Sequence, residues 1–201
     1  MNAPRRLALD THGASATEFA LVLPLLIILL LGMIDAGRFM WEYNSAEKAT
    51  QMGVRYAVAT GLVPSGLNGY SFAVSDNIPQ GTPVPNSNFD HAVCNASNCN
   101  TCTGSMCGSI GYDGAAFTNI VDRMQAMYAP ITPANVQIEY RNVGIGFAGN
   151  PTGPDVSALV TVRLAGLQFQ PVTCLMFPCT ITMPSFSSAL TLEDAAGSVS
   201  N

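Results

Sequence analysis

The stretch that decides the fold is Gly13-Ala14-Ser15-Ala16-Thr17-Glu18-Phe19, which runs directly into the apolar block from Ala20 to Ile34. No charged residue occurs from Phe19 to Ile34. Together with the small residues before Glu18, this segment is long enough to cross a bilayer, which takes about 20 apolar residues. An ionisable side chain at membrane depth is costly, and it therefore indicates a function with a partner. Glu18 is the first candidate functional residue.

The residues before this segment predict its orientation. Arg5 and Arg6 are the only basic residues among residues 1–13, and short positive flanks tend to stay in the cytoplasm. The chain after Ile34 is then expected outside the cytoplasm. A cleaved secretory signal is the alternative, but the nearest small-x-small site is the poor Ile34-Asp35-Ala36, and Glu18 is wrong for an apolar signal core.

A glycine, a glutamate five residues later and a long apolar helix together resemble the class III signal of type IV pilin-like proteins. The pattern Gly13-x-x-x-x-Glu18-Phe19-Ala20-Leu21-Val22-Leu23-Pro24 resembles the TadE-like pseudopilins of the tight-adherence (Flp) pilus system. Two later segments also resemble that family, Gly32–Arg38 and Ala49–Val58. The rest of the chain resembles it only loosely.

The resemblance implies that a prepilin peptidase cuts between Gly13 and Ala14 and removes residues 1–13 as a cytoplasmic leader. Glycine suits such a site because it has no side chain to obstruct a cramped active site. The resemblance also implies that Glu18 pairs with the new amine of Ala14 on a neighbouring subunit, so that each charge offsets the desolvation of the other. The alternative is that Glu18 only reaches the headgroups. Besides Glu18, we expect Phe19 and Pro24 to take part in assembly.

On this basis we expect a structural pseudopilin or minor pilin that assembles or primes a tight-adherence pilus through helix packing. The implied partners are other pilins and pseudopilins, the pilus assembly platform, the prepilin peptidase and membrane lipid. The implied location is the inner membrane, with a single pass, a cytoplasmic N-terminus and a periplasmic head, and incorporation into the extracellular pilus. The alternative is a single-pass, membrane-anchored binding module that does not polymerise.

Residues 14–61 read as one long helix that spans the membrane in its first half. Its outer half carries a stripe at helical spacing, and small residues on such a stripe permit close approach of another helix. The stripe is expected to pack on the protein's own head, on neighbouring subunits or on both. It consists of Phe39, Tyr43, Ala46, Ala49, Gly53 and Ala57. Pro24 removes one backbone donor and is expected to kink the helix.

Residues 62–201 are expected to form an extracytoplasmic α+β head. From Leu62 to Gly114 the chain is rich in Pro, Gly, Ser and Asn, which favours extended loop, and its Cys-rich part is residues 86–112. The six cysteines are an even number in an oxidising compartment, which favours disulfides. They are Cys94, Cys99, Cys102, Cys107, Cys174 and Cys179.

The pairing of these cysteines is open, and proximity alone favours Cys174 with Cys179 and pairing within the 94–107 cluster. A zinc site from that cluster and His91 is one alternative, although a second C-x2-C knuckle is missing. A redox pair of Cys99 and Cys102 is another, although the flanking residues read as loop rather than as a strand and a helix.

A second helix is predicted from Ala115 to Tyr128, with Asp113 as its cap. Its apolar face is Phe117, Ile120, Val121, Met124 and Met127. Strands are predicted at residues 135–141, 155–164 and about 180–192, and they are expected to form an antiparallel sheet that packs on the outer part of the long helix. The predicted fold class is therefore α+β, with a long N-terminal transmembrane helix and a small head whose loops are stapled by disulfides.

Composition and motifs exclude several functions. Only 8 Lys and Arg stand against 13 Asp and Glu, so no basic patch is available for nucleic acid. His91 is the one histidine after the leader, and no nucleophile elbow or phosphate-binding glycine loop is present. We therefore expect no enzyme, no cofactor and no metal.

Overall fold

The computed structural model describes residues 14–175 and 179–192, and it divides into two compact units. The first contains the chain up to Trp41 together with Phe169–Ile181, and the second contains Glu42–Gln168 together with the chain from Thr182. One helix, α2 (Ala14–Ala59), contributes to both units.

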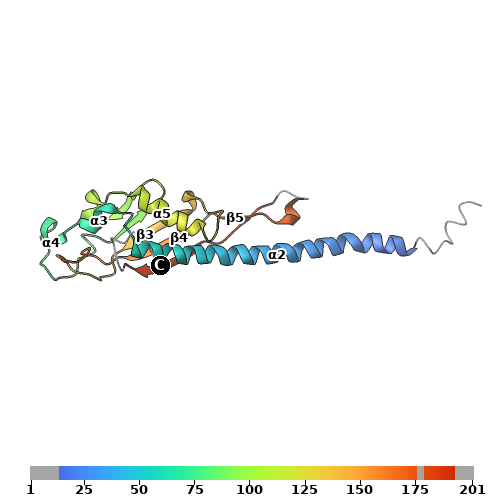
Figure 1. The fold of residues 1–201 in the computed structure, drawn as a ribbon, viewed down its shortest axis with the longest axis horizontal. Coiled ribbons are helices and arrows are strands. Elements are labelled where there is room, and N and C mark those ends of the chain that lie inside the picture. The colour runs from blue at the N-terminus through green and yellow to red at the C-terminus, as the bar shows by residue number, and fades with distance from the viewer. Residues whose placement is uncertain (1–13, 176–178, 193–201) are drawn as a thin grey trace, which may run out of the picture. The chain divides into compact units, whose positions relative to one another are not determined.

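The helix α2 is the element predicted at residues 14–61. Its 46 residues contain one proline, Pro24, and the helix continues through it. At 1.5 Å per residue it is roughly 70 Å long. Figure 1 shows it as a single element from the first described residue onward.

The second unit is built on a five-stranded sheet with the order β2-β1-β3-β4-β7, in which every neighbouring pair is antiparallel. The register sets Gln137 of β3 opposite Arg163 of β4, and Arg163 opposite Ser187 of β7. The strands are β1 (His91–Cys94), β2 (Thr101–Thr103), β3 (Val136–Arg141), β4 (Leu159–Leu164) and β7 (Phe186–Thr191). The predicted α+β class with an antiparallel sheet is confirmed.

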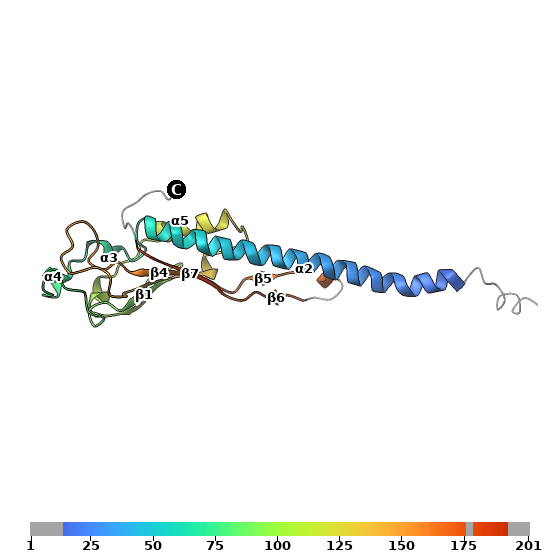
Figure 2. The same ribbon diagram turned by 90° about the horizontal axis from the view of Figure 1, so that it is seen from below.

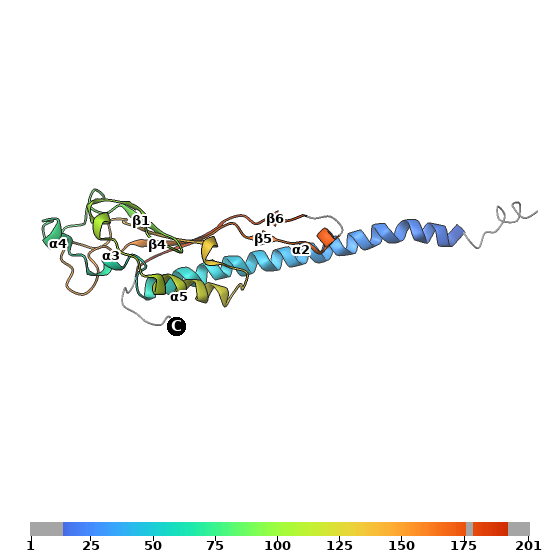
Figure 3. The same ribbon diagram turned by 90° about the horizontal axis from the view of Figure 1, so that it is seen from above.

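The core of this unit lies between one face of the sheet and two helices, the outer part of α2 and α5 (Gly114–Gln125). A side-chain carbon added to Gly53 of α2 would lie 2.7 Å from the Met124 side chain on α5 and 3.5 Å from Val162 on β4. Figures 2 and 3 show α5 beside this part of α2. The predicted packing of the sheet on the outer part of the long helix is therefore correct.

The helix α5 begins where its sequence predicts. The carboxylate of Asp113 accepts hydrogen bonds from the backbone N–H groups of Ala115, at 2.9 Å, and Ala116, at 3.0 Å, which would otherwise lack partners. Four of the five predicted apolar positions are buried. Met127 is instead 45% exposed, because α5 ends at Gln125 and residues beyond it no longer follow the helical face.

The first unit contains, beside α2, a segment that we call the arm, Phe169–Ile181. It holds the last residue of β5 (Gln168–Phe169), the 3-10 helix η4 (Val172–Leu175) and the first residue of β6 (Ile181–Thr182). The strands β5 and β6 pair as a separate two-stranded sheet.

The expectation of extended loop from Leu62 to Gly114 is wrong in part. This region contains α3 (Ser65–Gly69), α4 (Phe72–Ser75), the hairpin of β1 and β2, and η2 (Ser105–Ser109). These elements are too short to give a periodic pattern, and long-range contacts fix them. The backbone N–H of Phe72, for example, donates to the buried carboxylate of Asp155 at 2.8 Å.

Two strand predictions also need correction. The strand predicted at residues 180–192 is divided into β6 and β7, because Pro184 between them cannot donate to a strand ladder. The strand predicted at residues 155–164 begins only at Leu159. Before it, the Asp155 carboxylate accepts the backbone N–H of Asn150 at 2.9 Å, which holds a loop instead.

Candidate functional site

The membrane-length part of α2, residues 16–34, is exposed in the structure, and we call it the bare segment. Every residue from 16 to 34 is exposed except Leu31, which is half-buried. One helix in the described part of the chain, Ala16–Ala59, is long and apolar enough to cross a membrane, with a mean hydropathy of 2.6 over its most apolar window. An apolar surface of this length requires lipid or another apolar partner.

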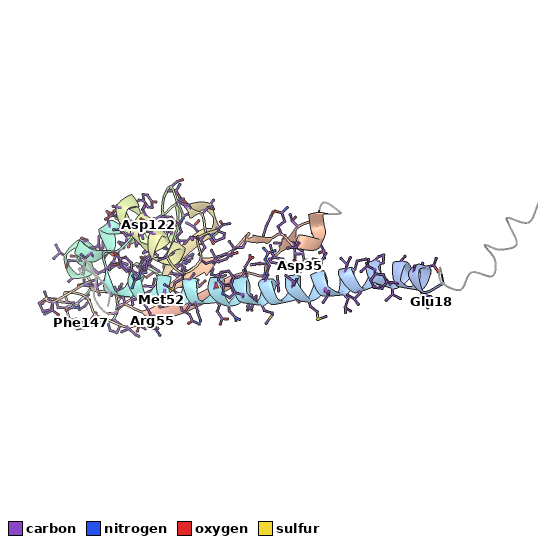
Figure 4. The ribbon with its side chains drawn as sticks, turned by 45° about the vertical axis from the view of Figure 1, so that its right-hand side comes forward. Glu18, Asp35, Met52, Arg55, Asp122 and Phe147 are labelled. Atoms are coloured by element: carbon purple, nitrogen blue, oxygen red, sulfur yellow. A yellow bond between two sulfur atoms is a disulfide. The ribbon has the colours of Figure 1, made fainter. Side chains whose placement is uncertain are left out.

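Glu18 lies in the second turn of α2 and is exposed, with the 64%-exposed Phe19 beside it (Figure 4). Glu18 is thus at the start of the bare segment and Pro24 lies inside it. Gly13, the predicted processing site, lies outside the described residues, and Ala14 is the first residue of α2. The sequence-predicted assembly residues therefore share one end of one helix.

Asp35 ends the bare segment, and its carboxylate binds the arm. One oxygen accepts the backbone N–H of Val172 at 2.6 Å, and the other accepts the backbone N–H and the hydroxyl of Thr173 at 2.9 and 2.8 Å. Arg38, one turn further along α2, lies 3.7 Å from the same carboxylate. No sequence pattern indicates that Asp35 has a partner near residue 172.

Two aromatic contacts continue this attachment within the first unit. The rings of Phe39 and Phe169 meet edge to face with centroids 5.3 Å apart. The guanidinium of Arg38 lies 5.4 Å from the centroid of the Phe169 ring, within the range of a cation–π contact. The arm is therefore held on α2 by polar and apolar contacts together.

The stripe of small residues on the outer half of α2 packs on the protein's own head. Ala46, Ala49 and Ala57 have no exposed surface, and Gly53 is buried against α5 and β4. This surface is therefore not available to a neighbouring helix. On other sides of α2, the exposed residues include Met40 and Trp41, and Trp41 is 67% exposed.

The six cysteines form three disulfides, Cys94–Cys99, Cys102–Cys107 and Cys174–Cys179. In each pair the cysteines are 5 positions apart in sequence; Cys94–Cys99 begins at the end of β1, and Cys102–Cys107 joins β2 to η2. Since every sulfur of the 94–107 cluster is bonded, neither the zinc alternative nor a Cys99–Cys102 pair fits this arrangement. Within residues 14–175 and 179–192, no group of three or more His, Cys, Asp or Glu could hold a metal ion.

His91 lies next to a network of charged side chains on the outer face of the sheet. Its Nδ1 lies 2.7 Å from the Asp90 carboxylate, which Arg141 approaches to 3.8 Å. Arg141 and Arg163 both contact the carboxylate of Glu139, at 2.6 and 3.2 Å. Both arginines of this network therefore have a carboxylate partner.

A groove of about 680 Å³ lies at one end of this sheet face, where the turn closed by Cys94–Cys99 meets the turn before β3. Its lining includes Gln137, Arg163 and Ser187, which the register sets side by side on three adjacent strands. Its size suits a small ligand, and it contains one cation and no acidic residue.

A second exposed surface in the head is apolar, and the sequence did not reveal it. Val143, Ile145 and Phe147 alternate with glycines in the loop after β3, and each is at least 40% exposed (Figure 4). Gly146 has a φ of +99°, and a side-chain carbon there would lie 2.5 Å from the Asp155 carbonyl oxygen. The loop conformation therefore requires glycine at this position.

Comparison with known families gives one match. The family model described as TadE-like protein matches residues 13–55, which run from the glycine before α2 to Arg55. This match confirms the resemblance predicted from that stretch. Comparisons with curated proteins and with solved structures give no match.

Proposed function

We propose that this chain is a pseudopilin or minor pilin, a structural subunit that assembles or primes a tight-adherence pilus. The observation that carries the proposal is the bare apolar half of α2 with Glu18 at its start, inside the segment that matches the TadE-like family. A pilin-like protein needs such a helix twice, first to hold the subunit in the membrane and then to pack with other helices in a fibre.

The proposed role of Glu18 follows from the cost of its charge. An unpaired carboxylate next to a membrane-length apolar surface is unfavourable, and a cation at the same depth offsets that cost. After cleavage between Gly13 and Ala14, the new amine would lie one turn before Glu18 on the same helix surface. In a bundle of parallel copies, the amine of one subunit can reach the carboxylate of the next.

The proposed location is the inner membrane, with the N-terminus in the cytoplasm and the head in the periplasm. Arg5 and Arg6 before α2 support this orientation. The three disulfides of the structure support an oxidising compartment for the residues after the anchor.

The test is piliation of a cell whose own copy is replaced by variants of the full chain. We expect Glu18→Gln and Glu18→Leu to give processed protein with an intact head and roughly tenfold fewer pili, because the charge pair is lost. Glu47→Gln is the matched control, since Glu47 is exposed on the same helix outside the apolar segment. Normal piliation by Glu18→Leu would contradict the proposed pairing.

A second candidate is an anchored binding module that does not polymerise, and the groove lined by Arg163 favours it. This candidate predicts that the N-terminus stays intact and that Glu18 variants have no effect. It also predicts that Gln137→Ala and Arg163→Ala abolish attachment of cells to their target while the protein level is unchanged. Loss of pili in the Glu18 variants would decide against it.

A further inference from the structure

We propose that the groove at the end of the sheet face binds an acidic oligosaccharide, a short chain of sugars of which at least one carries a carboxylate. The proposal goes beyond the pilus role and does not depend on it, because the groove belongs to the second unit and Glu18 belongs to the first.

The groove exists because β1 is shorter than β3. Cys94 of β1 is opposite Ile138 of β3, and the same register would set residue 96 opposite residue 136. The chain leaves the sheet there instead, because the side-chain oxygen of Asn95 accepts the backbone N–H groups of the second and third residues after it, at 2.8 and 3.0 Å. As a result β1 does not pair with Val136, and Val136 lines the groove.

Both walls of the groove are fixed by local structure. The disulfide Cys94–Cys99 closes the turn that forms one wall. In the other wall, the amide oxygen of Asn135 accepts the hydroxyl and the backbone N–H of Thr132, at 2.6 and 3.1 Å, and its amide nitrogen donates to the Ala165 carbonyl at 3.0 Å. Walls that are already ordered lose little conformational entropy when a ligand binds.

The floor of the groove presents side-chain donors and acceptors that the head itself does not use. Gln137, Arg163 and Ser187 lie in a row across three strands. Among the residues that the structure describes, the side chains of Gln137 and Ser187 have no hydrogen-bond partner. An amide and a hydroxyl can each donate and accept. They therefore match the hydroxyl groups of a sugar, which also do both.

The rest of the lining and the size of the groove also suit a short oligosaccharide. Small-molecule sites of about 300–1,000 Å³ combine apolar walls with a few placed polar groups, and the groove has about 680 Å³. Its apolar residues can cover the C–H faces of sugar rings while the amide and hydroxyl groups bind the ring substituents. These apolar residues include Pro133, Ala134, Val136 and Ala165.

Arg163 supplies the positive charge for a carboxylate. One of its nitrogens lies 3.2 Å from the Glu139 carboxylate, which Arg141 also contacts at 2.6 Å. Two arginines share this one carboxylate, and the other nitrogens of Arg163 have no partner within the described part of the chain. A guanidinium binds a carboxylate through two parallel hydrogen bonds, so Arg163 can hold an acidic sugar in one orientation.

The position of the groove favours a sugar over a peptide. An extended peptide gains main-chain hydrogen bonds by adding a strand to a free sheet edge. The floor of the groove lies mainly on β3 and β4, which are interior strands and pair with a neighbour on each side. A ligand there meets side chains rather than free backbone groups, and a sugar needs only side-chain partners.

The test is isothermal titration calorimetry on the full chain in phosphatidylcholine nanodiscs, with trigalacturonate as the acidic probe. Maltotriose is the neutral probe of the same length, and triaspartate is the acidic peptide probe. Nanodiscs avoid maltoside detergents, whose sugar headgroups would compete. The groove variants are Arg163→Ala and Gln137→Glu. Arg55→Ala is the matched control, because it removes an exposed cation of α2 that does not line the groove (Figure 4).

We expect the wild-type protein to bind trigalacturonate at least about tenfold more tightly than either other probe. Arg163→Ala should weaken this binding about 10–100-fold, the loss typical of a hydrogen bond to a charged group. Gln137→Glu keeps the shape of the side chain and adds a negative charge beside Arg163, so it should weaken trigalacturonate similarly and leave maltotriose unchanged. Arg55→Ala should bind like the wild type. Equal Tm values for all variants would show that binding is lost without unfolding.

No binding of trigalacturonate, or an equal loss in Arg163→Ala and Arg55→Ala, would overturn the proposal. Binding of maltotriose or triaspartate as tight as that of trigalacturonate would also overturn it, because the groove would then recognise a neutral sugar or an acidic peptide. None of these results bears on the anchor. Conversely, normal piliation by Glu18→Leu would contradict the proposed pairing of Glu18 and leave the groove unaffected.

Discussion

The carboxylate of Asp35 accepts two hydrogen bonds from Thr173, one from its backbone N–H at 2.9 Å and one from its hydroxyl at 2.8 Å, across 138 residues of sequence. The negative charge of Asp35, at the end of the apolar segment, therefore has hydrogen-bond donors within the same chain. Hydrogen bonds to a charged group contribute about 1.5–3 kcal/mol each, more than neutral ones. The attachment of the arm to α2 therefore depends strongly on one side chain.

Replacing Asp35 by alanine should release the arm. The backbone N–H groups of Val172 and Thr173 lose their acceptor, and we expect their hydrogen exchange to become about 10–100-fold faster, the change that corresponds to roughly 1.5–3 kcal/mol. The measurement is hydrogen exchange followed by mass spectrometry on the full chain in detergent.

Asp122→Ala is the matched control for this exchange experiment. Asp122 is an exposed aspartate on α5, in the other unit of the structure (Figure 4). Its replacement should leave the exchange of residues 169–175 unchanged. Unchanged exchange in Asp35→Ala would show that the arm is held by other contacts.

Gly53→Leu should destabilise the head. A side-chain carbon at Gly53 would lie 2.7 and 2.8 Å from two atoms of the buried Met124 side chain. Overpacking of this kind costs about 1–3 kcal/mol. Gly37→Leu is the control in the same helix, because no atom lies within 4 Å of its added carbon. Thermal unfolding should show a lower Tm for Gly53→Leu alone, and equal Tm values for the two variants would contradict the packing described.

The Cys102–Cys107 disulfide, which joins β2 to η2, should stabilise the head. A closed loop of this length contributes about 2 kcal/mol through the unfolded state. We expect the free energy of unfolding of the double variant Cys102→Ala/Cys107→Ala to fall by that amount. The variant should therefore unfold at a lower denaturant concentration than the wild-type protein. A second readout is thiol alkylation, which should label none of the six cysteines before reduction and all of them after it. Labelling of the wild-type protein before reduction would contradict the three pairs.

We expect the Tyr128 hydroxyl to lose its proton at a higher pH than an ordinary tyrosine does. Burial first, and then the hydrogen bond to the Glu42 carboxylate at 3.0 Å and its charge, raise the pKa of Tyr128 to about 12. Because the usual pKa is 10.0, the folded state keeps a proton that the unfolded state releases first. The stability from this group is present below pH 10 and is lost as the pH rises toward 12.

The measurement for Tyr128 is the difference in tyrosinate absorbance between wild type and Tyr128→Phe as the pH is raised. We expect a midpoint near the raised value, and a lower midpoint when Glu42→Gln removes the negative charge. A midpoint at the ordinary tyrosine value in the wild-type protein would show that Tyr128 and Glu42 do not interact in solution.

The sequence predicted the parts of the fold that have a long regular pattern. The uninterrupted apolar run after Glu18 predicts α2, and Asp113 followed by an amphipathic stretch predicts α5. The alternation in Val160-Thr161-Val162 predicts β4. These patterns are local, since helix and strand periodicity depend on residues a few positions apart.

The contacts that sequence could not predict are long-range ones. The acceptor role of Asp35 depends on where residues 172 and 173 lie, and the short elements between residues 62 and 114 depend on partners such as Asp155. The exposed apolar loop at residues 143–147 looks like a turn in sequence, because its glycines dominate the pattern. The row of Gln137, Arg163 and Ser187 exists only once the register of three strands is known.

The central proposal is that residues 1–13 are a leader that is removed. The mature protein then starts at Ala14 and acts as a pilin-like subunit. This proposal is tested most directly by the intact mass and N-terminal sequence of the protein recovered from membranes of a host with the matching prepilin peptidase. We predict a chain that starts at Ala14 with Ser15 next, and a Gly13→Asp variant that keeps its leader. A chain that still starts at Met1 would contradict the claim and leave an anchored module.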